Sequence, residues 1–179
     1  MAGAGTQAGA THAGLVSQLD LFPTLAALSG AAGGAGGGAA AETSAPSLPS
    51  AGRDLSAILT GRGAPDDREQ ARAVFMEQEE TRAIRTPDWL YAARFRDAPG
   101  FELGDELYDL RQDPLERYNL IESPEHAETA AGLRAEVEAF FDRYSQPQYD
   151  LWTGGRAKSN VTFNGFWQDA WGPEWQPLL

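Results

Sequence analysis

The side chains in this sequence best suited to bind an anion are four closely spaced arginines. A guanidinium group presents paired N–H donors that can bind two oxygens of an oxyanion at once. The arginines lie on a predicted hairpin, at Arg82, Arg85, Arg94 and Arg96. The alternative explanation is ion pairing with the acidic residues that precede them, Glu77, Glu79 and Glu80. We predict Arg82, Arg85 and Arg94 as candidate contacts to an anionic substrate, and the ion-pair alternative stays open.

Acidic residues near the middle of the chain could bind a metal ion. Carboxylates are ligands for calcium, and four of them fall close together at Asp105, Glu106, Asp109 and Asp113. Their spacing lacks the glycine-bearing loop of a known calcium motif, which favours a solvated acidic edge. His126 has no evident Ser or Asp partner nearby that would make it a general base. We therefore predict no catalytic residue and no metal site in this chain.

Three segments with strand-like patterns predict a small antiparallel sheet that would position these side chains. Residues 71–80 are expected as one strand, and residues 81–95 as a hairpin that turns at Thr86-Pro87-Asp88. A further strand is expected around Tyr108 and should stop near Arg111. The expected sheet has three or four strands.

A helix is predicted over residues 123–146. Ser123 is expected as its cap and Pro124 as its first residue, with acidic residues early and Arg143 late. Its apolar stripe consists of Leu133, Val137, Phe140, Phe141 and Tyr144. Packing this stripe against one face of the sheet gives an α+β fold.

Two sequence blocks carry the most information. ELYDLRQDPLERYNL, residues 106–120, ends a strand in a turn at Asp113-Pro114, because proline fixes φ and removes a backbone donor. VSQLDLFPTLAALSG, residues 16–30, predicts a helix from about residue 20 to residue 29. Asp20 is expected as its N-cap, with Pro23 in the first turn and Gly30 at the end.

Together with GRDLSAILTG (52–61) and TRAIRTPDWLYAARF (81–95), these blocks resemble the sulfatase family, in that family's order. The likeness is to arylsulfatase-like members of the alkaline phosphatase superfamily. It covers only the C-terminal portion of their α/β fold. The resemblance gives structural rather than catalytic roles to the motif residues Asp20, Pro23, Thr24, Tyr108, Asp109, Leu110, Asp113 and Asn119.

The resemblance implies that a full-length member would hydrolyse sulfate esters with a calcium ion and a formylglycine. The family makes formylglycine from Cys or Ser in a Cys/Ser-x-Pro-x-Arg motif, and this chain has no Cys. Ser47-Leu48-Pro49-Ser50 imitates the motif, but Ala51 stands where the Arg is needed and the first basic residue is Arg53. We therefore expect no cofactor in this chain, and expect calcium and formylglycine in the full-length protein.

Composition predicts three regions. Residues 1–52 should contain the helix at about 20–29 and a flexible linker rich in Gly, Ala, Ser and Pro. Residues 53–146 should form the sulfatase C-terminal subdomain, and residues 147–179 an aromatic-rich wrapping tail.

The tail places Trp167, Trp171 and Trp175 on one face if it is helical, although Gly172 and Pro173 oppose a long helix. Exposed aromatic side chains need a surface to cover them. We expect an arm that packs on a catalytic domain. The alternative is that Trp167 and Trp171 cover an active site and contact an organic or cationic group of the substrate.

The charge of the chain restricts its partners. A net charge of −12 and a pI of about 4.5 argue against nucleic acid and against an anionic membrane. The sequence shows no signal peptide and no apolar run of membrane-spanning length, so a cytoplasmic location is expected for the chain as written.

The sequence thus predicts a C-terminal fragment of a sulfatase-type hydrolase that is inactive alone. Its expected partner is a missing or separately encoded catalytic domain, or a second copy bound through the aromatic tail. Two other hypotheses stay open. The chain could be a non-catalytic interaction or scaffold module, or its parent could act on phosphodiesters or phosphonates.

Overall fold

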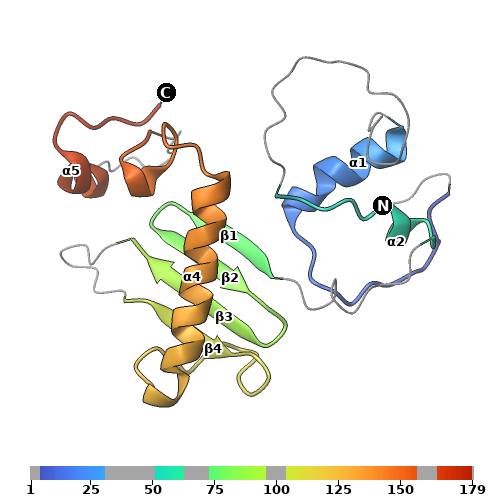
Figure 1. Cartoon of the computed structure of the whole chain (residues 1–179), viewed down its shortest axis with the longest axis horizontal. Helices are drawn as coiled ribbons and strands as arrows, with labels where there is room; N and C mark the ends of the chain where they lie inside the picture. Colours follow the sequence, from blue (N-terminus) through green and yellow to red (C-terminus); the bar gives the residue numbers. More distant parts are fainter. Residues whose placement is uncertain (1–4, 31–50, 63–72, 96–103, 157–164, 179) are drawn as a thin grey trace. The chain divides into compact units, whose positions relative to one another are not determined.

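The computed structural model describes residues 5–30, 51–62, 73–95, 104–156 and 165–178. The chain divides into two compact units, unit 1 from Met1 to Val74 and unit 2 from Phe75 to Leu179 (Figure 1). The predicted linker at residues 31–50, which includes Ser47, lies outside the described residues. The predicted three-part division at residues 52 and 146 stays a prediction.

Unit 2 is built around a four-stranded sheet with the order β1-β2-β3-β4 (Figure 1). The strands are β1 (Val74–Gln78), β2 (Thr81–Arg85), β3 (Trp89–Arg94) and β4 (Glu106–Asp109). β3 pairs antiparallel with both β2 and β4. All the predicted strands are therefore confirmed, and the last one stops two residues before the expected Arg111.

The predicted hairpin turn joins β2 to β3. The Thr86 amide donates to the Trp89 carbonyl at 2.8 Å, and the Thr86 hydroxyl accepts from the Trp89 amide at 2.9 Å. This closure sets a register in which Ile84 pairs with Tyr91. Both of these side chains are fully buried, so the register places the apolar side chains of both strands in the core.

Helix α4 (Ala127–Tyr144) crosses one face of the sheet and contacts β2 and β3 (Figure 1). The predicted stripe supplies the contact: Leu133, Val137 and Phe141 are buried, and the Phe140 ring stacks on Phe75 of β1 at 3.9 Å between centroids. Because these side chains recur at helical spacing, they form one continuous apolar face. Burying it against the sheet gives unit 2 its core.

The start of this helix differs from the prediction. Pro124 is at the first helical position as expected, but it begins a short 3-10 turn, η2 (Pro124–His126). The Ser123 side chain makes no capping hydrogen bond. A 3-10 turn can satisfy helix-end amides with backbone carbonyls, and here the His126 amide donates to the Ser123 carbonyl at 3.0 Å.

The C-terminal segment forms two short helices, η3 (Leu151–Thr153) and α5 (Gly165–Trp171). Gly172 follows α5 with a φ of 101°, so the helix ends where Gly172 and Pro173 predicted. Leu151, Trp167 and Trp175 form a second buried cluster in unit 2. Phe95, Trp152 and Trp171 pack against it.

Unit 1 contains η1 (Gln18–Asp20), α1 (Leu21–Ser29) and α2 (Ser56–Leu59). Gly30 ends α1 with a φ of 74°, as predicted. Among the described residues of this unit, Leu55 is the one large apolar side chain that is buried. The described residues of unit 1 therefore bury few large apolar side chains.

The α+β prediction is confirmed: a small antiparallel sheet is covered by a helix in the C-terminal part of the chain. Within the described part of the chain, no helix combines the length and the apolar character that crossing a bilayer requires.

Candidate functional site

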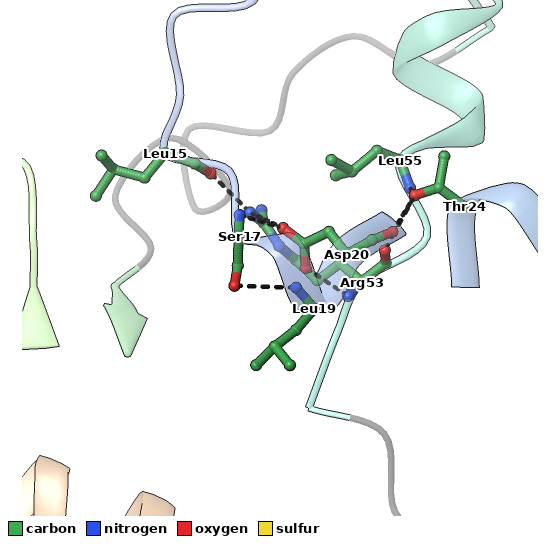
Figure 2. A network of polar contacts seen from close by, with 7 residues as sticks. All are labelled: Leu15, Ser17, Leu19, Asp20, Thr24, Arg53 and Leu55. Atoms are coloured by element: carbon green, nitrogen blue, oxygen red, sulfur yellow. Dashed lines mark hydrogen bonds and ion pairs between the residues drawn. The ribbon is translucent and has the colours of Figure 1, made fainter. Parts of the chain in front are cut away.

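The Asp20 carboxylate is the centre of a polar network that joins two segments distant in sequence (Figure 2). Its Oδ1 accepts a hydrogen bond of 2.7 Å from the Arg53 amide, 33 residues away. Its Oδ2 accepts from the Ser17 amide at 2.9 Å and from the Arg53 guanidinium at 3.3 Å. The same guanidinium donates to the Leu15 carbonyl at 2.8 Å. A buried ion pair therefore ties the entry of α1 to the segment before α2.

Asp20 occupies the predicted N-cap position of α1, but its side chain does not cap that helix. The carboxylate instead completes a capping box with Ser17 at the start of η1. The reason is that η1 continues directly into α1, so Asp20 already has helical dihedrals, φ −73° and ψ −15°, rather than the extended ones of a cap. Its oxygens are left for Arg53.

Thr24 extends this network one turn further along α1, where it is fully buried (Figure 2). Its hydroxyl donates to the Asp20 carbonyl at 2.6 Å, with the Arg53 carbonyl at 3.3 Å, and accepts from the Leu55 amide at 2.9 Å. Pro23 lies in the first turn of α1, as predicted. The hydroxyl thus links α1 to the start of α2.

Replacing Thr24 by valine should loosen this link. The shape is nearly kept, but the Leu55 amide loses its acceptor, and an unsatisfied buried donor costs about 1–3 kcal/mol. Hydrogen exchange of the Leu55 amide is expected to become faster by the corresponding factor. Thr24→Ser, which keeps the hydroxyl, is the control. Equal exchange in the valine variant and the wild type would show that the bond is not formed.

Asp109 organises the turn that follows β4. Its buried carboxylate accepts two hydrogen bonds of 3.0 Å from the Arg111 guanidinium, one of 3.0 Å from the Gln112 side chain and one of 3.1 Å from the Arg111 amide. These bonds, that of the Arg111 side chain above all, lower the pKa of Asp109 to about 2. Asp109 is therefore an ionised structural group.

The pH dependence of this turn follows from that pKa. Because the carboxyl pKa is lower in the folded state, about 2 against 3.8, the unfolded chain binds more protons. The stabilisation should be complete above about pH 4 and lost as the pH falls from about 4 to about 2. An NMR titration of the Asp109 carboxyl carbon should give a midpoint near 2, and a midpoint near 4 would contradict these contacts. Asp109→Asn should abolish the dependence.

Other motif residues also hold the backbone around β4. The Asp113 carboxylate accepts from the backbone amides four and five positions ahead, at 2.6 and 2.8 Å. The Asn119 side-chain oxygen accepts from the Leu107 amide at 2.9 Å and from the amide two positions ahead at 3.0 Å. Leu110 is buried, and the Tyr108 hydroxyl donates to Glu106. Each of these contacts is made within the chain's own fold.

The acidic residues near β4 are engaged singly rather than as a cluster. Asp105 accepts from the Tyr91 hydroxyl at 2.6 Å and from the Arg94 amide at 2.9 Å, and it forms an ion pair with Arg134 at 3.0 Å. Burial raises the pKa of Tyr91, so the hydroxyl remains a donor. Within the described ranges, no three metal-ligating side chains gather. The structure therefore gives each of Asp105, Glu106 and Asp109 a protein partner, and the predicted absence of a metal site stays a prediction.

Of the predicted anion contacts, Arg82 is the most enclosed. Its guanidinium donates to Asp150 at 2.6 Å and to Glu77 at 2.9 Å. Its carbon lies 4.1 Å from the ring centroid of Phe141 and 4.7 Å from that of Trp152. Arg82 therefore joins β2, α4 and the C-terminal segment, and the ion pairing left open in the sequence is present. Contact with a substrate stays a prediction.

The other predicted arginines are spread over unit 2. Arg85 forms an ion pair of 3.2 Å with Glu116, and both side chains are exposed. Arg94 donates to the Thr81 hydroxyl and to the Glu106 carboxylate, while its buried Nε has no hydrogen-bond partner among the described residues. Arg96 lies outside the described residues. Arg82, Arg85 and Arg94 thus each have an acidic partner within the chain, and their contact with a substrate stays a prediction.

The candidate tail residues Trp167 and Trp171 both pack within unit 2. Their rings lie 5.0 and 5.6 Å from the Phe95 ring, which follows β3. Trp167 is 2% exposed, and the Trp171 indole donates to the Leu151 carbonyl at 2.8 Å. This packing supplies a surface for the aromatic side chains inside the chain itself. Their predicted contact with a substrate is untested.

Two residues that organise these contacts did not stand out in the sequence. The sequence marks Arg53 only as the first basic residue after Ser47-Leu48-Pro49-Ser50 and gives Asp150 no role, although each forms an ion pair with a predicted residue. Asp150 also caps η3 by accepting from the Trp152 amide at 2.9 Å. An acidic residue directly before a short helix is a weak capping signal, and it gives no sign of Arg82, 68 residues away.

The comparisons place this fold among sulfatase structures. No protein-family model and no curated protein matches the sequence. Among solved structures, a 2-O GAG sulfatase is similar at 28% identity over 81% of this chain, with a TM-score of 0.55. A Bacteroides thetaiotaomicron protein labelled 6S-sulf, from a glycosaminoglycan-metabolism locus, is similar at 26% identity over 73%, with a TM-score of 0.50. The Agrobacterium radiobacter phosphonate monoester hydrolase has 19% identity and a TM-score of 0.47 over 70%.

The class defined by the fold is an α+β fragment of the sulfatase fold. The 2-O GAG sulfatase and the 6S-sulf protein are similar to this chain both in sequence identity and in backbone structure. The chain spans only 29% and 26% of the lengths of these two structures.

Proposed function

We propose that this chain is the C-terminal part of a sulfuric ester hydrolase and that hydrolysis requires a catalytic portion outside it. The carrying observation is the likeness to the 2-O GAG sulfatase over 81% of this chain but 29% of that one. The motif of residues 106–120 supports the proposal, because it forms β4 and the turn after it, where Asp109 and Asp113 accept backbone hydrogen bonds.

In this proposal unit 2 is a scaffold. Its ionisable motif residues are engaged in hydrogen bonds that hold backbone and turns, as Asp109 and Asp113 do. The formylglycine and calcium that the resemblance implies would belong to the other portion. There they would supply the nucleophile and the positive charge that sulfate-ester cleavage needs.

The test is an assay of the purified chain with calcium and an aryl sulfate. No sulfate release above background is expected, because an uncatalysed ester lacks both an activated nucleophile and preorganised charge. Turnover by the chain alone that disappears in Ser47→Ala would contradict the proposal. A 2-O-sulfated glycosaminoglycan and a phosphonate monoester should be assayed in parallel, since both are named for structures similar to this fold.

A further inference from the structure

Unit 1 displays a continuous set of exposed apolar side chains. Large side chains with between 47% and 78% of their surface exposed are Val16, Leu19, Leu21, Phe22 and Leu25. We call this set the 16–25 face. On α1, Leu21 and Leu25 are one helical turn apart and Phe22 lies beside them, so these three share one side of the helix. Exposed apolar groups gathered in this way mark an interaction surface.

The 16–25 face is held in place by polar contacts. Asp20 and Thr24 lie within the same ten residues but are buried. Their hydrogen bonds to Arg53 and to the Leu55 amide hold the start of α1 to the segment before α2 (Figure 2). The face is thus presented by a preformed scaffold, which lowers the entropy that docking must overcome.

The aromatic tail is a weaker candidate for the same role. Trp167 and Trp175 are 2% and 4% exposed, and both belong to the cluster with Leu151. Their surface is already covered by the chain. Among the described residues, the densest run of exposed large apolar side chains in the sequence lies on unit 1 instead, at residues 16–25.

The sulfatase likeness indicates what covers the 16–25 face. The match to the 2-O GAG sulfatase takes in 81% of 179 residues, or about 145 residues. Unit 2, from residue 75 to residue 179, has only 105. Part of unit 1 therefore belongs to the matched fold, and 71% of the matched sulfatase chain lies beyond the match.

We infer that the 16–25 face is the surface on which unit 1 docks the remaining, catalytic portion of the hydrolase. The inference rests on the proposed function and names its partner surface. The face contains no charged side chain, so it suits the apolar surface of a protein and not an anionic sulfated substrate. Docking would bury, between two portions, the apolar side chains that the 16–25 face leaves exposed.

The experiment uses the full chain, tagged and co-expressed with the polypeptide encoded directly upstream of it. Wild-type chain is expected to retain that polypeptide on affinity purification. Phe22→Asp and Leu25→Asp should each weaken retention at least about tenfold, because a buried carboxylate is strongly disfavoured. Leu115→Asp, the same change at an exposed loop position of unit 2, is the matched control and should retain it as the wild type does.

Three results would overturn the inference. The wild-type chain could fail to retain the upstream polypeptide, or the Phe22→Asp variant could retain as much of it as the wild type does. Third, Phe22→Asp could change the melting temperature or the dimerisation of the isolated chain, which would mean that this chain or a second copy covers the 16–25 face. Retention that depends on Phe22 without sulfate-ester turnover would leave the docking surface standing and refute the proposed function. Sulfate-ester turnover with retention that does not depend on Phe22 would support the proposed function and refute the docking surface.

Discussion

Asp150→Ala is expected to destabilise unit 2 by about 3–5 kcal/mol, because it leaves the Arg82 guanidinium buried without its closest counter-charge. Arg82 and Asp150 have side chains that are 9% and 6% exposed, and the acidic partner that remains, Glu77, is 43% exposed and so compensates the buried charge less well. The melting temperature should fall by more than about 10 °C in a thermal unfolding experiment. The helical cap on Trp152 is lost at the same time and adds to the effect.

The double variant Arg82→Met/Asp150→Ala separates the charge effect from packing. Removing both charges should recover part of the loss, because replacing a buried pair by apolar groups is often close to neutral. Arg85→Ala is the exposed control and should cost less than about 1 kcal/mol, since its pair with Glu116 is solvated. An Asp150→Ala variant as stable as the Arg85→Ala variant would refute the buried ion pair.

Trp167→Ala is expected to cost about 3–5 kcal/mol and to release the C-terminal segment. Trp167 is buried between Phe95 and Trp175, and truncating a core tryptophan loses its buried area and leaves a cavity. The fluorescence of the remaining tryptophans should shift to longer wavelength, and hydrogen exchange should accelerate over residues 165–178. Both changes can be measured without any substrate.

Tyr149→Ala is the matched control for this variant. Tyr149 is an aromatic residue of the same segment but is 51% exposed, so its loss should change the stability by less than about 0.5 kcal/mol. A Trp167→Ala variant that keeps wild-type stability would mean that the tail is not part of the unit 2 core. Its tryptophans would then remain available to cover a substrate or a partner, as the sequence alternatives held.

The sheet and the main helix could be predicted because local signals determine them. Proline at position 87 marks the hairpin turn, and the apolar spacing of Leu133, Val137 and Phe141 marks the buried side of α4. The turn and the apolar spacing agree with the observed secondary structure, so the strands and the helix lie where the sequence predicts. The end of α1 at Gly30 follows from the same kind of signal.

The pairs that organise the site could not be predicted, because they join residues far apart in sequence. Asp20 meets Arg53 across 33 residues, and Arg82 meets Asp150 across 68. No local sequence pattern indicates which carboxylate will form an ion pair with a given arginine. The role of Asp20 was wrong in detail for this reason, since the capping position was correct but the oxygens are bound by Arg53.

The most direct test of the account is sulfate release by the chain extended with its upstream coding sequence. That sequence should be read in all three frames for a Cys/Ser-x-Pro-x-Arg motif and an acidic pair, and the extended protein expressed with the formylglycine-generating machinery. The account predicts release of sulfate from an aryl sulfate or a sulfated glycosaminoglycan by the extended protein, and none by residues 1–179 alone. Equal release by both, or an extended protein that folds but releases no sulfate, would contradict it.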